Sequence, residues 1–235
     1  MKIAALADIH IRESSKGLFN EFFAEIGQTA DVMLICGDLT DRGLPSEAAV
    51  LCEELREVRI PIITVLGNHD FHNNQQEDIK KILKDAGKIV LDKEPYEYNG
   101  VGFAGIKGFM GGFDTHELGA FGEPLMKQIV ADTDDEAHDL ENQLKALQTE
   151  QKIVLMHYSP IQETLRGEAP EIHVFLGATR FAQVIDQFGG TTVFHGHAHY
   201  GSPEGKTGKG VPVYNVALQV MKKKSPKQPY ALIEV

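Results

Sequence analysis

The chain has 235 residues, of which 42% are hydrophobic and 24% charged, a composition typical of a folded globular protein. Its 23 basic and 34 acidic residues give a net charge of −11, which argues against a nucleic-acid binder that relies on a basic surface. The longest apolar runs, such as residues 60–66, are far shorter than the roughly 18 residues that a membrane helix needs.

The amino terminus and the cysteines favour an intracellular protein. The first residues meet a charge at Asp8, which is too early for a secretory signal. The two cysteines, Cys36 and Cys52, lie inside apolar patterns and are expected to be reduced and buried. We therefore expect a cytoplasmic protein without membrane association. No linker, repeat or charge block divides the sequence, so we expect a single domain over residues 1–235.

Short apolar runs rich in β-branched residues recur along the chain without polar–apolar alternation. They cover residues 2–7, 32–36, 61–66, 152–156 and 191–194. Unalternating runs of this kind predict strands that are buried on both faces of a sheet.

Amphipathic stretches separate these runs and predict helices. Apolar residues recur at helical spacing over residues 18–26, 48–58 and 79–86, and Pro45 stands where the first turn of a helix tolerates proline. A capping box over residues 133–136 predicts that a fourth helix begins there. Strands and helices thus alternate, as in a layered α/β fold.

The remaining apolar segments predict further strands. Residues 96–106 indicate a strand pair that turns at Asn99-Gly100. Residues 211–216 and 230–235 indicate two more strands, and the polar residues 222–229 between them are expected to form a loop.

Asp, Asn or His follows every one of the five buried runs. These residues are Asp8 and His10; Asp38 and Asp41; Asn68, His69 and Asp70; His157; and His195, His197 and His199. The carboxyl ends of strands in an open α/β sheet are where ligands bind, so we expect these side chains to converge. A single histidine after a strand is more often structural, but imidazole, carboxylate and amide oxygen together suit Mn²⁺, Fe²⁺ or Zn²⁺. About seven such groups fit two ions that share a ligand.

Five motifs in this set resemble those of the calcineurin-like metallophosphoesterase superfamily, in the same order. They are Asp8-Ile9-His10, Gly37-Asp38-Leu39-Thr40-Asp41, Gly67-Asn68-His69-Asp70, His157 and Gly196-His197-Ala198-His199. The resemblance implies an α/β fold in which a two-sheet β-sandwich is flanked by helices, in four layers, with two metal ions at one end.

The resemblance also implies which residues hold each ion. One ion would be held by Asp8, His10, Asp38 and His199, and the other by Asp38, Asn68, His157 and His197, with Asp38 shared. His69 would be the catalytic phosphate contact or proton donor, and Asp70 would orient its ring. Spacing alone allows His195 with His197 as readily as His197 with His199, whereas the family pattern selects the second pair.

The activity implied by the resemblance is hydrolysis of a small phosphodiester or phosphomonoester, without a covalent intermediate. A hydroxide bridging the two ions would attack phosphorus in line. Arg12 and Arg42 are candidates to contact the phosphate, with surface ion pairs as the alternative reading. Phe109 and Phe113, in a glycine-rich stretch, are candidates to cover the leaving group or else fill the edge of the core.

The sequence also allows other functions to be weighed. Residues 37–43 are close to the second motif of the protein Ser/Thr phosphatases, but Ile11 stands where those enzymes carry glycine. Asp41 stands where purple acid phosphatases carry a tyrosine ligand, and the acidic balance disfavours a DNA-repair nuclease. A scaffold that keeps this fold, binds protein partners and has lost catalysis is the alternative from a different class. The intact ligand set, together with His69, argues against it.

Overall fold

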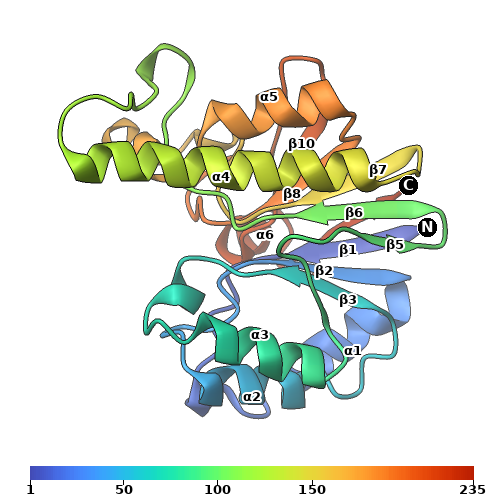
Figure 1. Ribbon diagram of the computed structural model, residues 1–235. Coiled ribbons are helices and arrows are strands. Elements are labelled where there is room, and N and C mark those ends of the chain that lie inside the picture. Colours follow the sequence, from blue (N-terminus) through green and yellow to red (C-terminus); the bar gives the residue numbers. More distant parts are fainter.

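The computed structural model describes residues 1–235, which form two mixed β-sheets packed face to face between layers of helices (Figure 1). The first sheet has the strand order β11-β1-β2-β3-β4. Its strands are β1 (Lys2–Leu6), β2 (Val32–Cys36), β3 (Ile62–Val65), β4 (Ile89–Val90) and β11 (Ala231–Glu234). β1 to β4 are parallel, and β11 pairs antiparallel with β1 at one edge.

The second sheet has the strand order β5-β6-β7-β8-β10-β9. Its strands are β5 (Tyr96–Tyr98), β6 (Val101–Gly105), β7 (Gln151–Leu155), β8 (Thr192–His195), β9 (Glu204–Lys206) and β10 (Pro212–Asn215). β6, β7, β8 and β10 run parallel, and an antiparallel strand closes each edge.

Helices cover the outer face of each sheet (Figure 1). Beside the first sheet lie α1 (Asn20–Thr29), α2 (Pro45–Glu54) and α3 (Gln76–Asp85). Beside the second lie α4 (Pro124–Ala146) and α5 (Thr179–Phe188), while the short α6 (Leu218–Lys224) lies near the junction of the sheets. This arrangement confirms the two-sheet sandwich flanked by helices.

Burial on both faces explains why the strand sequences do not alternate. In β1, Ile3 and Ala5 belong to the hydrophobic cluster between the two sheets. The intervening Ala4 and Leu6 belong to the cluster between the first sheet and its helices. Successive side chains of a strand point to opposite faces, so a strand with a core on each side must be apolar at every position.

The predicted hairpin is confirmed by its backbone. Asn99 and Gly100 have φ angles of +48° and +79° between β5 and β6. Two consecutive left-handed residues form the type of two-residue turn whose twist matches a β-hairpin, and Asn-Gly tolerates them best. The proline prediction is also confirmed, because α2 begins at Pro45.

Two predicted element boundaries are wrong. The fourth helix does not begin at the capping box, because α4 already begins at Pro124 and runs through it. Thr133 lies inside the helix, where its hydroxyl donates to the carbonyls of Ile129 and Met110 instead of capping an end. The expected loop over residues 222–229 contains the last turn of α6, whose apolar side is buried. No helix combines the length and the hydropathy needed to span a membrane.

Candidate metal centre

The predicted ligands meet at the carboxyl edge of the two sheets. They follow β1, β2 and β3 in the first sheet and β7 and β8 in the second. Four of them, Asp8, His10, Asp38 and His197, have positive φ angles of 57°, 45°, 50° and 68°. Left-handed backbone costs free energy in a non-glycine residue and persists where the surrounding structure enforces it. Strained residues of this kind cluster at functional sites, so this edge is the candidate site.

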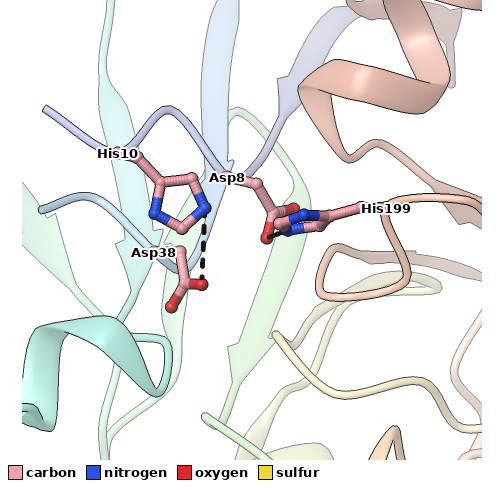
Figure 2. A group of neighbouring side chains, drawn as sticks. All are labelled: Asp8, His10, Asp38 and His199. Carbon is pink, nitrogen blue, oxygen red and sulfur yellow. Dashed lines mark hydrogen bonds and ion pairs between the residues drawn. The ribbon is translucent and has the colours of Figure 1, made fainter. Parts of the chain in front are cut away.

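One group of four side chains is centred on two buried carboxylates. Figure 2 shows Asp8, His10, Asp38 and His199 turned toward one another, and their candidate ligand atoms all lie within 4.8 Å of each other. Nε2 of His199 is 2.9 Å from Oδ1 of Asp8, and Nε2 of His10 is 3.7 Å from Oδ2 of Asp38.

A second group shares Asp38 with the first. Asp38, His157 and His197 place their candidate ligand atoms within the same 4.8 Å limit. Nε2 of His157 lies 3.3 Å from Oδ1 of Asp38 and 2.8 Å from Oδ1 of Asn68. The Asn68 amide oxygen therefore faces the same space. Every residue of the implied ligand set is thus present in one of two adjoining groups, and Asp38 belongs to both.

The electrostatics of the two groups favour cations. Asp8 and Asp38 are each 1% exposed, and burial followed by the Asp8 charge raises the pKa of Asp38 well above its usual value. Burial also lowers the pKa of His10 to about 4 and of His197 to about 3. The imidazoles of His10 and His197 are therefore neutral at pH 7 and present lone pairs. His199 differs, because burial is outweighed by its hydrogen bond to Asp8 and by the Asp8 charge, which raise its pKa.

The donor set fits divalent ions. Imidazole, carboxylate and amide donors without thiolate are the ligands of Mn²⁺, Fe²⁺ and Zn²⁺. His10 has a buried Nδ1 atom with no hydrogen-bond partner. The other ring nitrogens of the second group are oriented by carbonyls: His157 Nδ1 lies 3.1 Å from the Cys36 oxygen, and His197 Nε2 lies 3.3 Å from that of Phe175. Such outer contacts are typical of metal-ligating histidines.

The chain matches the calcineurin-like phosphoesterase family over residues 1–201. It belongs to that family. No curated protein matches the chain in sequence. Among solved structures, this phosphoesterase is similar to the phosphopantetheinyl hydrolase PptH from Mycobacterium tuberculosis, with 14% identity, a TM-score of 0.67, and coverage of 99% of this chain and 95% of the other. It is also similar to TT1561 of Thermus thermophilus, with 16% identity, a TM-score of 0.63, and coverage of 99% and 98%. At these identities the likeness shows the fold alone.

Two glycines of the phosphoesterase motifs make room for the carboxylates. A Cβ atom at Gly67 would lie 2.2 Å from Oδ1 of Asp38, and one at Gly196 would lie 2.4 Å from Oδ2 of Asp8. Because these contacts are far below van der Waals distance, the motifs require glycine at both positions.

His69 lies beside the first group. Its backbone N–H donates to Oδ1 of Asp38 at 2.9 Å, and its ring is 4.5 Å from the His10 ring between centroids. Its Nδ1 atom is 2.7 Å from the backbone carbonyl oxygen of Asp41. Since a carbonyl only accepts, this contact places a proton on Nδ1.

Asp70 differs from the expectation, because its carboxylate makes no hydrogen bond to the His69 ring. Its oxygens accept hydrogen bonds from the N–H groups of Gly67, Leu39 and Thr40 and from the Thr40 hydroxyl. Asp70 is fully buried, so its role is to join the loops after β2 and β3. The backbone carbonyl of Asp41 orients the His69 ring instead. Residue spacing in the sequence does not reveal this contact.

Both candidate arginines converge on Asp41. The Arg12 guanidinium contacts the two Asp41 oxygens at 3.0 and 3.2 Å, and Nε of Arg42 lies 3.9 Å away. Asp41 also lies 3.9 Å from Nδ1 of His10. The motif spacing placed Asp41 at this edge without indicating that it lies between the two arginines and His10.

The two candidate phenylalanines have different surroundings. Phe113 is 4% exposed and packs in a small cluster with Leu165, Leu176 and Ala198, so it fills the core as the alternative reading expected. Phe109 is half-buried, and its ring lies 5.9 Å from that of Tyr158, which in turn is 4.3 Å from the His197 ring. Phe109 is thus half-buried beside the ring that contacts His197, whereas Phe113 is buried in the core against Ala198, which stands between His197 and His199 in the chain.

His195 lies behind the two groups and belongs to neither. Its Nδ1 atom contacts the Gly196 carbonyl at 2.8 Å, and its Nε2 atom contacts the Thr164 and Ser159 hydroxyls at 2.9 and 3.4 Å. Of the three histidines, His197 and His199 therefore belong to the candidate ligand groups, and His195 does not.

A pH-dependent stability is expected from His195. Burial lowers the pKa of His195 from 6.5 to about 4. At a pH between these two values the ring is neutral in the folded chain and protonated in the unfolded chain. Its contribution to stability is complete above pH 6.5 and is lost as the pH falls toward 4, at up to about 1.4 kcal/mol per pH unit. Urea unfolding of the metal-free protein and of His195→Gln should show a shallower acid dependence in the variant. Parallel curves would contradict this assignment, and exposed His116→Gln serves as the control.

Proposed function

We propose that this phosphoesterase uses two divalent ions to hydrolyse a small phosphodiester or phosphomonoester. The observation that carries the proposal is the position of Asp38, a buried carboxylate that belongs to both ligand groups. One carboxylate shared by two adjoining groups is the arrangement that places two ions side by side.

The chain's residues have distinct proposed roles. Asp8, His10 and His199 hold one ion, Asn68, His157 and His197 hold the other, and Asp38 bridges them. When bound, the ions lower the pKa of water and polarise phosphoryl oxygens. Their charge outweighs that of the two carboxylates, so the centre attracts an anion although the chain as a whole is acidic.

His69, Arg12 and Arg42 are the proposed contacts to substrate. His69 is placed beside His10, where it can protonate the departing oxygen. The side chains of Arg12 and Arg42 are 64% and 73% exposed, so a phosphate can displace part of their contact with Asp41. Phe109 is the proposed wall beside the leaving group.

The proposed ions are manganese, iron or zinc, and the proposed location is the cytoplasm. The mixed nitrogen and oxygen donors support the choice of manganese, iron or zinc. Both cysteines are free thiols, which is the form expected in a reducing compartment.

Metal dependence is tested on protein stripped with a chelator. Hydrolysis of bis-p-nitrophenyl phosphate and p-nitrophenyl phosphate is expected to vanish on stripping and to return when Mn²⁺, Zn²⁺ or Fe²⁺ is restored singly. The ratio of the two rates indicates whether diesters or monoesters are preferred. Mg²⁺ should restore less, because it favours oxygen ligands over the histidines of this site.

The same experiment separates an enzyme from a scaffold. A protein that binds two ions by calorimetry and turns over neither substrate with any of them would favour the scaffold. If adding metal restored hydrolysis in the Asp38→Ala variant as well, the activity would come from a contaminating enzyme instead.

A further inference from the structure

The turn after β6 holds the backbone of a proposed metal ligand. The carbonyl oxygen of Lys107 accepts hydrogen bonds from the N–H groups of both His157 and Tyr158, at 3.0 and 3.1 Å. His157 is a ligand of the second ion, the one held with His197. The conformation of the Lys107–Gly108 turn therefore determines where the His157 backbone lies.

Glu136, in the middle of α4, fixes this turn from outside. Its Oε2 accepts a hydrogen bond from the Gly108 N–H at 2.9 Å, and its Oε1 lies 3.3 Å from Nζ of Lys107. Gly108 has a φ angle of +75°, a conformation that favours glycine and needs an external partner for its N–H group. One carboxylate thus ties both residues of the turn to the helix.

The same turn contacts the second ion's other histidine through Tyr158. Tyr158 is 5% exposed, and its ring lies 4.3 Å from the His197 ring and 5.5 Å from the His157 ring, between centroids. Nζ of Lys107 lies 5.3 Å from the Tyr158 centroid and 4.6 Å from that of Phe109. The ammonium therefore packs against the aromatic side chain that supports His197.

We propose that Glu136 is a positioning residue for the second metal ion, acting through the Lys107–Gly108 turn on His157 and through Tyr158 on His197. The proposal rests on the two-ion function proposed above. None of the five motifs contains Glu136, which lies on a different element from every ligand. The first ion's side chains, Asp8, His10 and His199, have no contact with this turn in the hydrogen-bond network.

Gln143 provides a matched control on the same helix face. It lies seven residues, or about two helical turns, beyond Glu136. Its amide accepts from the Gly105 N–H at 2.8 Å and donates to the Gly105 carbonyl at 2.9 Å. Gln143→Ala therefore also removes buried contacts between α4 and the end of β6, while leaving the turn's bond to Glu136 in place.

The test measures ion binding directly, by calorimetric titration of the metal-free protein with Mn²⁺. His199→Ala and His157→Ala assign the two binding steps to the first and second ion. Glu136→Ala is expected to weaken the second ion about 10- to 100-fold, the usual loss for an outer positioning group, and to leave the first nearly unchanged. Gln143→Ala should bind both ions as the wild type does. Glu136→Gln, whose amide oxygen can still accept from Gly108, should bind the second ion more tightly than Glu136→Ala.

Several results would overturn the proposal. Equal weakening of both ions, or the same loss in Gln143→Ala, would indicate general loosening of α4. Equal loss in Glu136→Gln and Glu136→Ala would trace the effect to the unpaired Lys107 charge rather than to the hydrogen bond. A wild-type protein that binds two ions without hydrolysing any phosphoester would contradict the proposed function while leaving this test intact.

Discussion

Replacing Asp38 with alanine is expected to abolish two-ion binding and to lower phosphoester hydrolysis by about three orders of magnitude or more. The loss follows from removing the only carboxylate common to both ligand groups. Several kcal/mol of charge stabilisation in the transition state depend on the ions, and each 1.36 kcal/mol is tenfold in rate. Calorimetric titration with Mn²⁺ and steady-state kinetics on bis-p-nitrophenyl phosphate measure the two effects.

Glu54→Ala is the control for loss of a buried carboxylate. Glu54 is 2% exposed and accepts hydrogen bonds from the N–H groups of Gly17 and Phe19. Neither donor belongs to a ligand group. This variant is expected to lose stability but to bind both ions. If Asp38→Ala retained two ions and its rate, the shared-ligand assignment would be wrong.

Replacing Asp38 with asparagine, which removes the charge but keeps the shape of the side chain, should not destabilise the metal-free protein at pH 8. Burial and the Asp8 charge raise the pKa of Asp38, so the folded state holds the ionised carboxylate less well than the unfolded chain does. Its contribution to stability therefore decreases as the pH rises through the raised pKa. Thermal unfolding of metal-free Asp38→Asn should occur at or above the wild-type temperature at pH 8. A lower temperature would show that hydrogen bonds to Asp38 outweigh the repulsion.

The convergence of the candidate ligands at one edge could be predicted, because each of them follows a strand whose burial is visible in the sequence. Runs such as residues 3–7 and 32–36 are apolar at every position because a core lies on both sides. Parallel strands bring their carboxyl ends to one edge, and β1 and β2 are adjacent in the sheet, so Asp8, His10 and Asp38 are neighbours. The sequence did not predict this strand order.

Contacts that cross between distant elements were not predictable in the same way. Asp70 stands next to His69 in the chain, yet its oxygens bind Gly67, Leu39 and Thr40, because a buried carboxylate takes the nearest free N–H groups. Sequence spacing carries no information on which backbone amides will lack partners after two loops pack. The position of Glu136 beside Gly108 is unpredictable for the same reason.

Helix boundaries failed where local signals competed. The capping box at Thr133 is a genuine pattern, but residues 124–132 form helix equally well and begin with proline, which suits a first turn. Once Pro124 starts the helix, Thr133 satisfies its hydroxyl with the Ile129 and Met110 carbonyls instead.

Removal of the His69 side chain should reveal whether it protonates the leaving group. His69→Ala is expected to slow hydrolysis of alkyl phosphoesters about 100- to 10,000-fold, the usual range for a general acid. p-Nitrophenolate is a stable anion that leaves without protonation, so p-nitrophenyl esters should lose far less. Comparing kcat for the two kinds of ester in the wild type and the variant separates these cases.

The same comparison of alkyl and p-nitrophenyl esters distinguishes proton donation by His69 from simple contact with the phosphate. Because its Nδ1 contacts the Asp41 carbonyl, only Nε2 is free to carry the proton that is donated. A residue that merely contacts the phosphate would weaken both kinds of ester equally when removed, since the phosphate is common to them. His69→Gln, which replaces the ring with a neutral amide donor, should then rescue both. Selective loss for alkyl esters, without rescue by glutamine, would assign the proton to His69 and fix the direction from which the leaving group departs.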